Sequence, residues 1–200
     1  MSTTSEQTQI AQLIERVNKL EDREAIHTVL YKYARGADRC DMKLFKSCYW
    51  DDATDFHWFF NGNAHKLADW VIPVLAEIPN SQHSITNPII DWEGDRAFVE
   101  SQWYVVHRIP LDEKRIIDQQ IEGRYVDVFE KRDGVWKIFH RRVAVEGWRE
   151  HITFPTPPSP ADARRFPNDS VYLGSKGLLE EVAPNMQGFD LWEDARSRHR

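Results

Sequence analysis

The chain has 200 residues, 41% of them hydrophobic, and a net charge of −6, a composition typical of one soluble domain with a buried core. No block of basic residues is present, which argues against nucleic acid as a partner. No apolar stretch approaches the roughly 18 residues that a membrane-spanning helix needs. Eight Trp residues raise the aromatic content to 12%, and aromatic side chains line apolar ligand pockets as well as cores.

The two cysteines, Cys40 and Cys48, form no motif that is typical of a zinc site, so we expect no metal. We expect two reduced thiols in a cytoplasmic protein, although the spacing leaves a disulfide open. The start of the chain is polar and then amphipathic. It lacks the basic start and apolar core of a signal peptide.

The first 40 residues carry apolar side chains at helical spacing. The first set runs from Ile10 to Leu20 and the second from Ile26 to Ala37, with the charged residues 21–24 between them. This pattern predicts two helices, or one bent helix, ending at Gly36, since glycine commonly terminates helices.

Shorter elements follow. Residues 40–50 predict a short helix, and residues 52–60 (DATDFHWFF) predict a strand followed by a turn at NGN (61–63). Residues 66–78 predict a helix with a kink or break near Pro73, because proline removes a helical hydrogen bond.

The pattern then changes to strands. Residues 83–109 predict two strands around a turn at 93–95, and residues 116–148 predict two more around 132–134. Helices followed by antiparallel strands indicate an α+β fold, in which a curved sheet packs against helices and encloses a pocket. We assign this domain to residues 1–150.

Residues 151–200 form a proline-rich extension, with a short helix expected near 189–198. Apolar residues follow the prolines, among them Val171, Leu173 and Trp192, and a disordered tail would carry fewer of them. We therefore expect the extension to act as a lid over the pocket or as an arm at a subunit interface.

Asp38 and His83 are the first candidates for chemistry. Asp38 follows a predicted helix, where the helix dipole disfavours a carboxylate, so a salt bridge to Arg39, solvation or an imidazole must compensate it. His83 precedes an apolar run in the stretch NSQHSITN and is either a surface histidine or the imidazole partner of Asp38. On composition alone His57, His65, His107 and His140 are equally available.

Three further residues could meet a substrate. Tyr33 lies five residues before Asp38 and could donate its phenolic hydrogen to a substrate oxygen, or be a core aromatic. Tyr49 could line a pocket or belong to the core. His107 follows Val99, Ser101, Trp103 and Val105 at a spacing of two residues, so in a strand all five side chains lie on the same face.

Only one of the adjacent residues Arg141 and Arg142 can point inward, because side chains alternate along a strand. We take Arg141 as the candidate for substrate binding. The alternative is that an inward arginine pairs with Asp127 and stabilises the fold.

Five stretches in order resemble the SnoaL-like branch of the NTF2-like superfamily over about residues 18–148: LEDREAIHTVLYKYARGADRCD, YWDDATDF, HSITNPIID, GDRAFVESQWYVVHR and EGRYVDVFEKRDGVWKIFHRRV. The resemblance implies a cone-shaped α+β barrel with an apolar pocket. Within the superfamily, the chain is similar to enzymes of the scytalone dehydratase, bile acid 7α-dehydratase and hexachlorocyclohexane dehydrochlorinase type.

Those enzymes imply an Asp–His dyad that works without a metal or organic cofactor, here Asp38 and His83, with Tyr33 as the polar residue five positions before the aspartate. The relatives also imply a homo-oligomer, a trimer or alternatively a dimer. The expected activity is a dehydratase-type lyase acting on a cyclic apolar small molecule. The alternatives are an isomerase with the same dyad, a non-catalytic binding protein, or a small subunit of an oxygenase.

Overall fold

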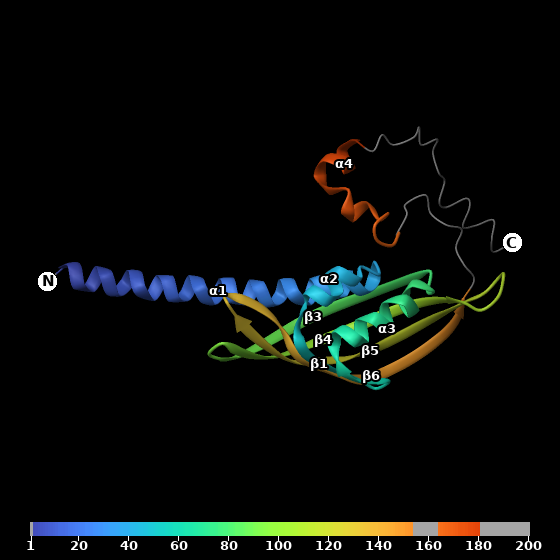
Figure 1. The fold of residues 1–200 in the computed structure, drawn as a ribbon, viewed down its shortest axis with the longest axis horizontal. Coiled ribbons are helices and arrows are strands. Elements are labelled where there is room, and N and C mark those ends of the chain that lie inside the picture. Colours follow the sequence, from blue (N-terminus) through green and yellow to red (C-terminus); the bar gives the residue numbers. More distant parts are fainter. Residues whose placement is uncertain (1, 154–163, 181–200) are drawn as a thin grey trace.

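The computed structural model describes residues 2–153 and 164–180, and it confirms the predicted α+β fold. In chain order the elements are α1 (Ser2–Asp38), α2 (Met42–Ser47), β1 (Tyr49–His57), β2 (Phe60–Asn63), α3 (Ala64–Ala76), β3 (Asn80–Glu93), β4 (Arg96–Pro110), β5 (Ile116–Arg132), β6 (Val135–Thr153), the 3₁₀ turn η1 (Ser170–Tyr172) and α4 (Gly174–Glu180) (Figure 1). No helix in these two ranges is long and apolar enough to cross a membrane.

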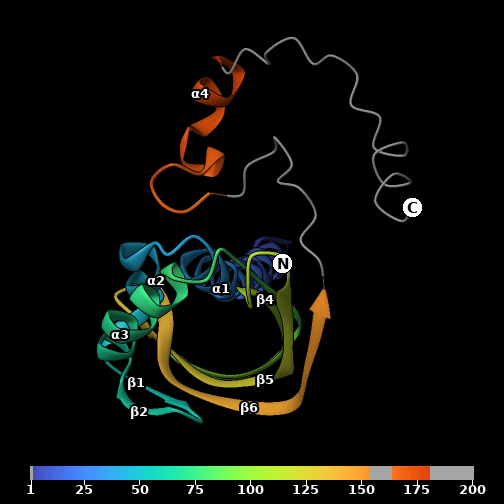
Figure 2. The ribbon, with the colours of Figure 1, turned by 90° about the vertical axis from the view of Figure 1, so that its right-hand side faces the viewer.

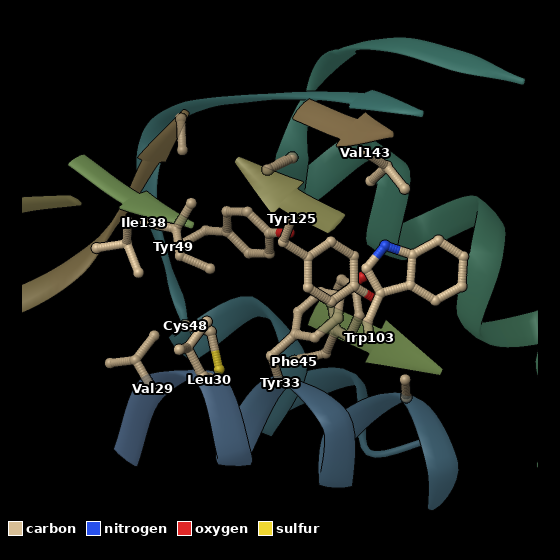
Figure 3. Packing of buried hydrophobic residues seen from close by; sticks show 14 of the residues in the cluster. Val29, Leu30, Tyr33, Phe45, Cys48, Tyr49, Trp103, Tyr125, Ile138 and Val143 are labelled. Atoms are coloured by element: carbon tan, nitrogen blue, oxygen red, sulfur yellow. The ribbon is translucent and has the colours of Figure 1, made fainter. Parts of the chain in front are cut away.

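The six strands form one sheet in the order β2-β1-β6-β5-β4-β3, with only β1 and β6 parallel. Figure 2 shows the sheet curved into a trough, with α1 and α3 along its open side. The core fills the space between them. α1 contributes one face at helical spacing, from Ile26 through Leu30 and Tyr33 to Ala37, and these side chains meet the strand residues shown in Figure 3.

The leading helix is one continuous element, so of the two predicted alternatives the single helix is the one observed. The charged residues that suggested a break continue the helix, and Asp22 anchors it to the β5–β6 hairpin. The Asp22 carboxylate accepts hydrogen bonds from Lys131 Nζ at 2.6 Å and Trp136 Nε1 at 2.8 Å. The spacing of neighbouring residues in the sequence cannot predict such long-range contacts.

The helix also continues past Gly36 to Asp38. Gly36 serves close packing: a Cβ there would lie 2.8 Å from the backbone nitrogen of Phe45 in α2. The glycine therefore lets α2 approach the last turn of α1, the turn that carries Asp38.

Two shorter predictions also need correction. The turn after β1 lies at Trp58 and Phe59, and the NGN stretch belongs to β2. α3 continues through Pro73 to Ala76, with Leu67, Ala68, Ile72 and Leu75 buried. Packing of this apolar face offsets the hydrogen bond that proline removes.

Part of the C-terminal extension rests on the domain. The Phe166 backbone N–H donates to the Arg39 carbonyl oxygen at 2.7 Å, and the Arg39 guanidinium pairs with the buried Asp169 carboxylate at 3.2 Å. β6 extends to Thr153, three residues beyond the predicted end of the domain. The prolines at 155–160 and the helix expected near 189–198 lie outside the described residues.

We predict that Gly36→Ala destabilises the domain. Helix propensity alone would favour alanine by about 1 kcal/mol. The clash with the Phe45 backbone opposes this, and overpacking typically costs about 1–3 kcal/mol. Urea unfolding should therefore show a lower free energy of unfolding for the variant; a gain of about 1 kcal/mol would show that α1 and α2 are not in close contact here.

Candidate active site

Asp38 and His83 meet where the end of α1 reaches the start of β3. The Asp38 carboxylate accepts a hydrogen bond from His83 Nδ1 at 2.6 Å, and the His83 backbone N–H lies 2.8 Å and 3.0 Å from its two oxygens. Ser81 Oγ donates to the same carboxylate at 3.3 Å. These donors satisfy a buried carboxylate at a helix C-terminus, and Arg39 pairs with Asp169 instead.

This contact sets the proton arrangement of the His83 ring. An ionised carboxylate can only accept hydrogen bonds, so Nδ1 must carry the proton. In the neutral ring Nε2 is then an acceptor, which is what a general base requires. His83 lines the main cavity, so its free nitrogen can meet a ligand there.

The cavity has a volume of about 260 Å³ and is lined by residues of helices α1, α2 and α3 and of the sheet. Its wall is predominantly aromatic and aliphatic. Its titratable groups among the described residues are Tyr33, His57, His83, His107 and Tyr125. The main apolar contributions come from Phe45, Trp58, Phe59, Trp70, Val74, Trp103, Ile121 and Trp148. A cavity of this character suits a compact apolar molecule with one or two polar groups.

Tyr33 belongs to the buried core and also lies in the cavity wall, with its ring roughly perpendicular to that of Tyr125 and the centroids 5.6 Å apart. Burial raises the pKa of Tyr33 to about 12, although the positive charge of Arg141 opposes the rise. The phenol therefore keeps its proton at neutral pH and can serve as a hydrogen-bond donor.

The predicted alternation that places His107 inward is confirmed. Val99, Ser101, Trp103 and Val105 are all buried, and His107 lines the cavity with its ring 5.9 Å from that of His83. Burial, together with the nearby His83, lowers the pKa of His107 to about 4, so this imidazole is neutral at pH 7. His107 Nδ1 and Trp103 Nε1 are buried without a partner in the part of the chain that the structure describes, and a ligand could satisfy both.

Arg141 points inward, as the alternation allowed, but it lies behind the cavity wall. Its guanidinium donates to Asp127 at 2.6 Å and 2.8 Å and lies over the ring of Tyr33 at 4.2 Å. Arg141 therefore pairs with Asp127 inside the fold, which is the alternative to substrate binding. It is absent from the described residues that line the cavity. Arg142 lies over the ring of Phe56.

Tyr49 is fully buried and is likewise absent from the cavity lining. Its hydroxyl donates to Asp55 Oδ2 at 2.6 Å. The other oxygen of Asp55 lies 2.5 Å from His57 Nδ1. Asp55 and His57 form a second Asp–His pair that the sequence analysis did not identify, although their spacing of two in a strand places both on one face.

The extension contacts the backbone next to the Asp38–His83 pair. Arg165 donates to the main-chain carbonyl oxygens of Asp38 and Ile78, the latter at 2.5 Å. One guanidinium therefore links the end of α1 to the segment before β3. Val171 lies at a shallow depression that His83 and Asp38 also line.

A curved sheet with leading helices along its open side is an α+β domain of the NTF2-like type, and here an Asp–His pair lies at its apolar cavity. Residues 18–142 match the model of the SnoaL-like domain, and the chain belongs to this family. A search of curated protein sequences found no match.

Solved structures with the same fold support this assignment. A hexachlorocyclohexane dehydrochlorinase of type 3 from Novosphingobium barchaimii is 20% identical, with a TM-score of 0.58 over 68% of this chain and 94% of the other. A protein from Novosphingobium aromaticivorans, provisionally named a scytalone dehydratase, is 19% identical, with a TM-score of 0.60 over 74% and 99%. Another from that organism, provisionally named an aromatic ring hydroxylase, is 18% identical, with a TM-score of 0.56 over 66% and 94%. At these identities the likeness shows the fold.

We predict that His107 makes the fold sensitive to mild acid. Below the ordinary histidine pKa of 6.5 the unfolded chain binds a proton that the folded chain does not bind until about pH 4. Stability should therefore fall as the pH decreases through this window. Melting temperatures should fall less between pH 7 and pH 4.5 for His107→Gln than for the wild type. Equal falls would show that His107 is not the buried neutral group.

We predict that Arg165→Gln loosens the attachment of the extension. The variant loses charged hydrogen bonds to two carbonyl groups, which are typically worth about 1.5–3 kcal/mol. Limited proteolysis should then cleave the segment around 164–180 faster. Arg115→Gln, which removes only the exposed pair with Asp112, is the matched control. Identical digestion of all three proteins would contradict the contact.

Proposed function

We propose that the chain is a cofactor-independent lyase that eliminates water, or a comparable leaving group, from a cyclic and largely apolar small molecule. The supporting observation is the hydrogen bond of 2.6 Å between His83 Nδ1 and Asp38, which leaves the second ring nitrogen to the cavity. The SnoaL-like family and structural neighbours that include a dehydrochlorinase are in keeping with elimination chemistry.

In this proposal His83 Nε2 removes a proton from a carbon of the substrate. Asp38 stabilises the imidazolium that forms and keeps the ring in one orientation. Tyr33, protonated at neutral pH, donates a hydrogen bond to a carbonyl or a departing oxygen. General base catalysis contributes about 10²–10⁴-fold, and positioning within the apolar cavity must supply the remainder.

Two other functions remain as alternatives. An isomerase would use the same pair and return the proton to a different carbon. A binding protein, or a small subunit of an oxygenase, would use the cavity without the pair, and the neighbour provisionally named an aromatic ring hydroxylase shares the fold. Product analysis distinguishes an isomerase from the proposed lyase, since isomerisation releases neither water nor chloride.

We predict that Asp38→Asn and His83→Ala each lower turnover by about 10²–10⁴-fold. The substrates are scytalone, hexachlorocyclohexane and related cyclic alcohols and chlorides, followed by chromatography of the products. The losses should not add in the double variant, because the two residues act as one unit. His140→Ala is the matched control, since that ring binds Thr54 away from the cavity.

Near wild-type turnover in both single variants would contradict the proposal. The assay should also be run after exhaustive chelation. We expect no loss of activity, and a loss that zinc or iron restores would contradict a cofactor-independent reaction.

A further inference from the structure

The second Asp–His pair repeats the arrangement of the first within the same cavity. Asp55 lies at 2.5 Å from His57 Nδ1, as Asp38 lies at 2.6 Å from His83 Nδ1. Both imidazoles line the cavity, so each has its second ring nitrogen available to a ligand. His57 comes from β1 and His83 from β3, strands that lie in different parts of the sheet.

The Asp55–His57 pair adjoins a buried group of charged side chains. Asp55 and Asp127 lie opposite Arg141 on the two strands that flank β6, and all three side chains are fully buried. Arg141 makes its ion pair with Asp127, so Asp55 has the His57 ring and the Tyr49 hydroxyl as its hydrogen-bond partners. Tyr49 donates to Asp55 and carries no charge, since burial raises its pKa well above the ordinary value.

The third imidazole of the cavity, His107, cannot act as a proton donor to a leaving group. Burial lowers the pKa of His107 to about 4, so at neutral pH its ring is uncharged, and the remaining N–H is too weak an acid to protonate a leaving group. A reaction that expels a hydroxyl group needs a proton donor at the departing oxygen, because hydroxide is a poor leaving group.

We propose that His57, held by Asp55, is a second catalytic residue and protonates the leaving group. His83 Nε2 takes the proton from carbon, and the electron pair of that C–H bond forms the new C=C bond. The C–O bond breaks, and the departing oxygen takes the proton from His57 Nε2 and leaves as water. The inference rests on the proposed function and assigns its acid.

The test compares two leaving groups, because chloride departs without a proton and hydroxyl does not. His57→Gln keeps a side chain that can donate to Asp55 and removes the acid. We expect it to lower dehydration of the cyclic alcohol by a factor at least about 10² larger than its effect on dehydrochlorination of the chloride. His83→Ala should lower both reactions.

Equal losses on both substrates in His57→Gln would indicate a structural role and overturn the inference, as would an unchanged rate on the alcohol. Either result leaves the proposed function intact. Failure of the wild type on every alcohol and chloride overturns the proposed function instead, and a binding experiment then decides whether His57 meets a ligand.

That experiment uses 2-naphthol as a cyclic apolar probe with one hydroxyl group. In protein with ¹⁵N-labelled histidine, we expect bound 2-naphthol to shift the Nε2 resonances of both His57 and His83, and to leave His140 unchanged. A shift of His83 alone, or no binding at millimolar concentration, would overturn a site that lies between two imidazoles.

A second, independent observation concerns the first turns of α1. This part of the helix projects beyond the sheet (Figure 1), and Ile10, Leu13, Val17 and Leu20 are each more than half exposed. The spacing of three and four residues places them at the a and d positions of two heptads. Ile26 is the first residue of the helix that enters the core.

We infer that this stripe pairs with the same stripe of a second copy of the chain in a parallel two-stranded coiled coil. The β-branched residues Ile10 and Val17 at a, with Leu13 and Leu20 at d, favour two strands. Arg16 then lies at a g position and Glu21 at the following e position, the pair that faces across a parallel dimer with opposite charge. Isolated helices of this length are marginal in water, so pairing also explains why the segment is helical.

Light scattering tests the dimer with a matched pair of lysine variants. The wild type and Glu15→Lys, a change on the outer side of the helix, should have twice the chain mass of 23.6 kDa. Val17→Lys should have the mass of one chain. Arg16→Glu should weaken the dimer, and Arg16→Glu combined with Glu21→Arg should restore it. A monomeric wild type, a trimer, or a Val17→Lys protein that stays associated would overturn the inference.

Discussion

The hydrogen bonds of the Asp38 carboxylate join the two elements that form the site, the end of α1 and the start of β3. The carboxylate lies in the last turn of α1 and accepts hydrogen bonds from both the backbone and the ring of His83 at the start of β3. Two neighbouring contacts hold these elements in position. Gly36 lets α2 pack closely beside the same turn, and Arg165 ties the Asp38 carbonyl to that of Ile78. A helix C-terminus is a poor place for a carboxylate, so the position is stabilised only while these donors stay in place.

The cavity shows how one kind of side chain can take different parts according to its surroundings. His83 and His57 are each held through Nδ1 by a carboxylate, whereas His107 lies beside His83 without one. Burial without a charge partner keeps His107 neutral. The family assignment gives the fold, and these local differences support the division into a base, an acid and a neutral hydrogen-bonding group that we propose.

The sequence predicted the order of helices and strands because each rests on local periodicity. The inward face of His107 follows from alternation along one strand, and the pairing of Asp38 with His83 came from the ordered family pattern. The sequence left open whether α1 is one helix or two, because the contacts of Asp22 reach a hairpin more than 100 residues away. The choice between Arg141 and Arg142 depends on the opposing Asp127 and on strand register, which sequence alone leaves open. The alternation of Asp55 and His57 was a usable signal, since it placed both on one face.

The most direct measurement is the protonation pattern of the His83 ring, read from long-range ¹H–¹⁵N correlation spectra of histidine-labelled protein at neutral pH. The account predicts a protonated Nδ1 and an unprotonated Nε2 in the wild type, with this preference lost in Asp38→Asn while the remaining histidines are unchanged. A proton on Nε2 of the neutral ring, or a pattern that Asp38→Asn leaves as it was, would contradict the claim that Asp38 makes His83 a base directed at the cavity.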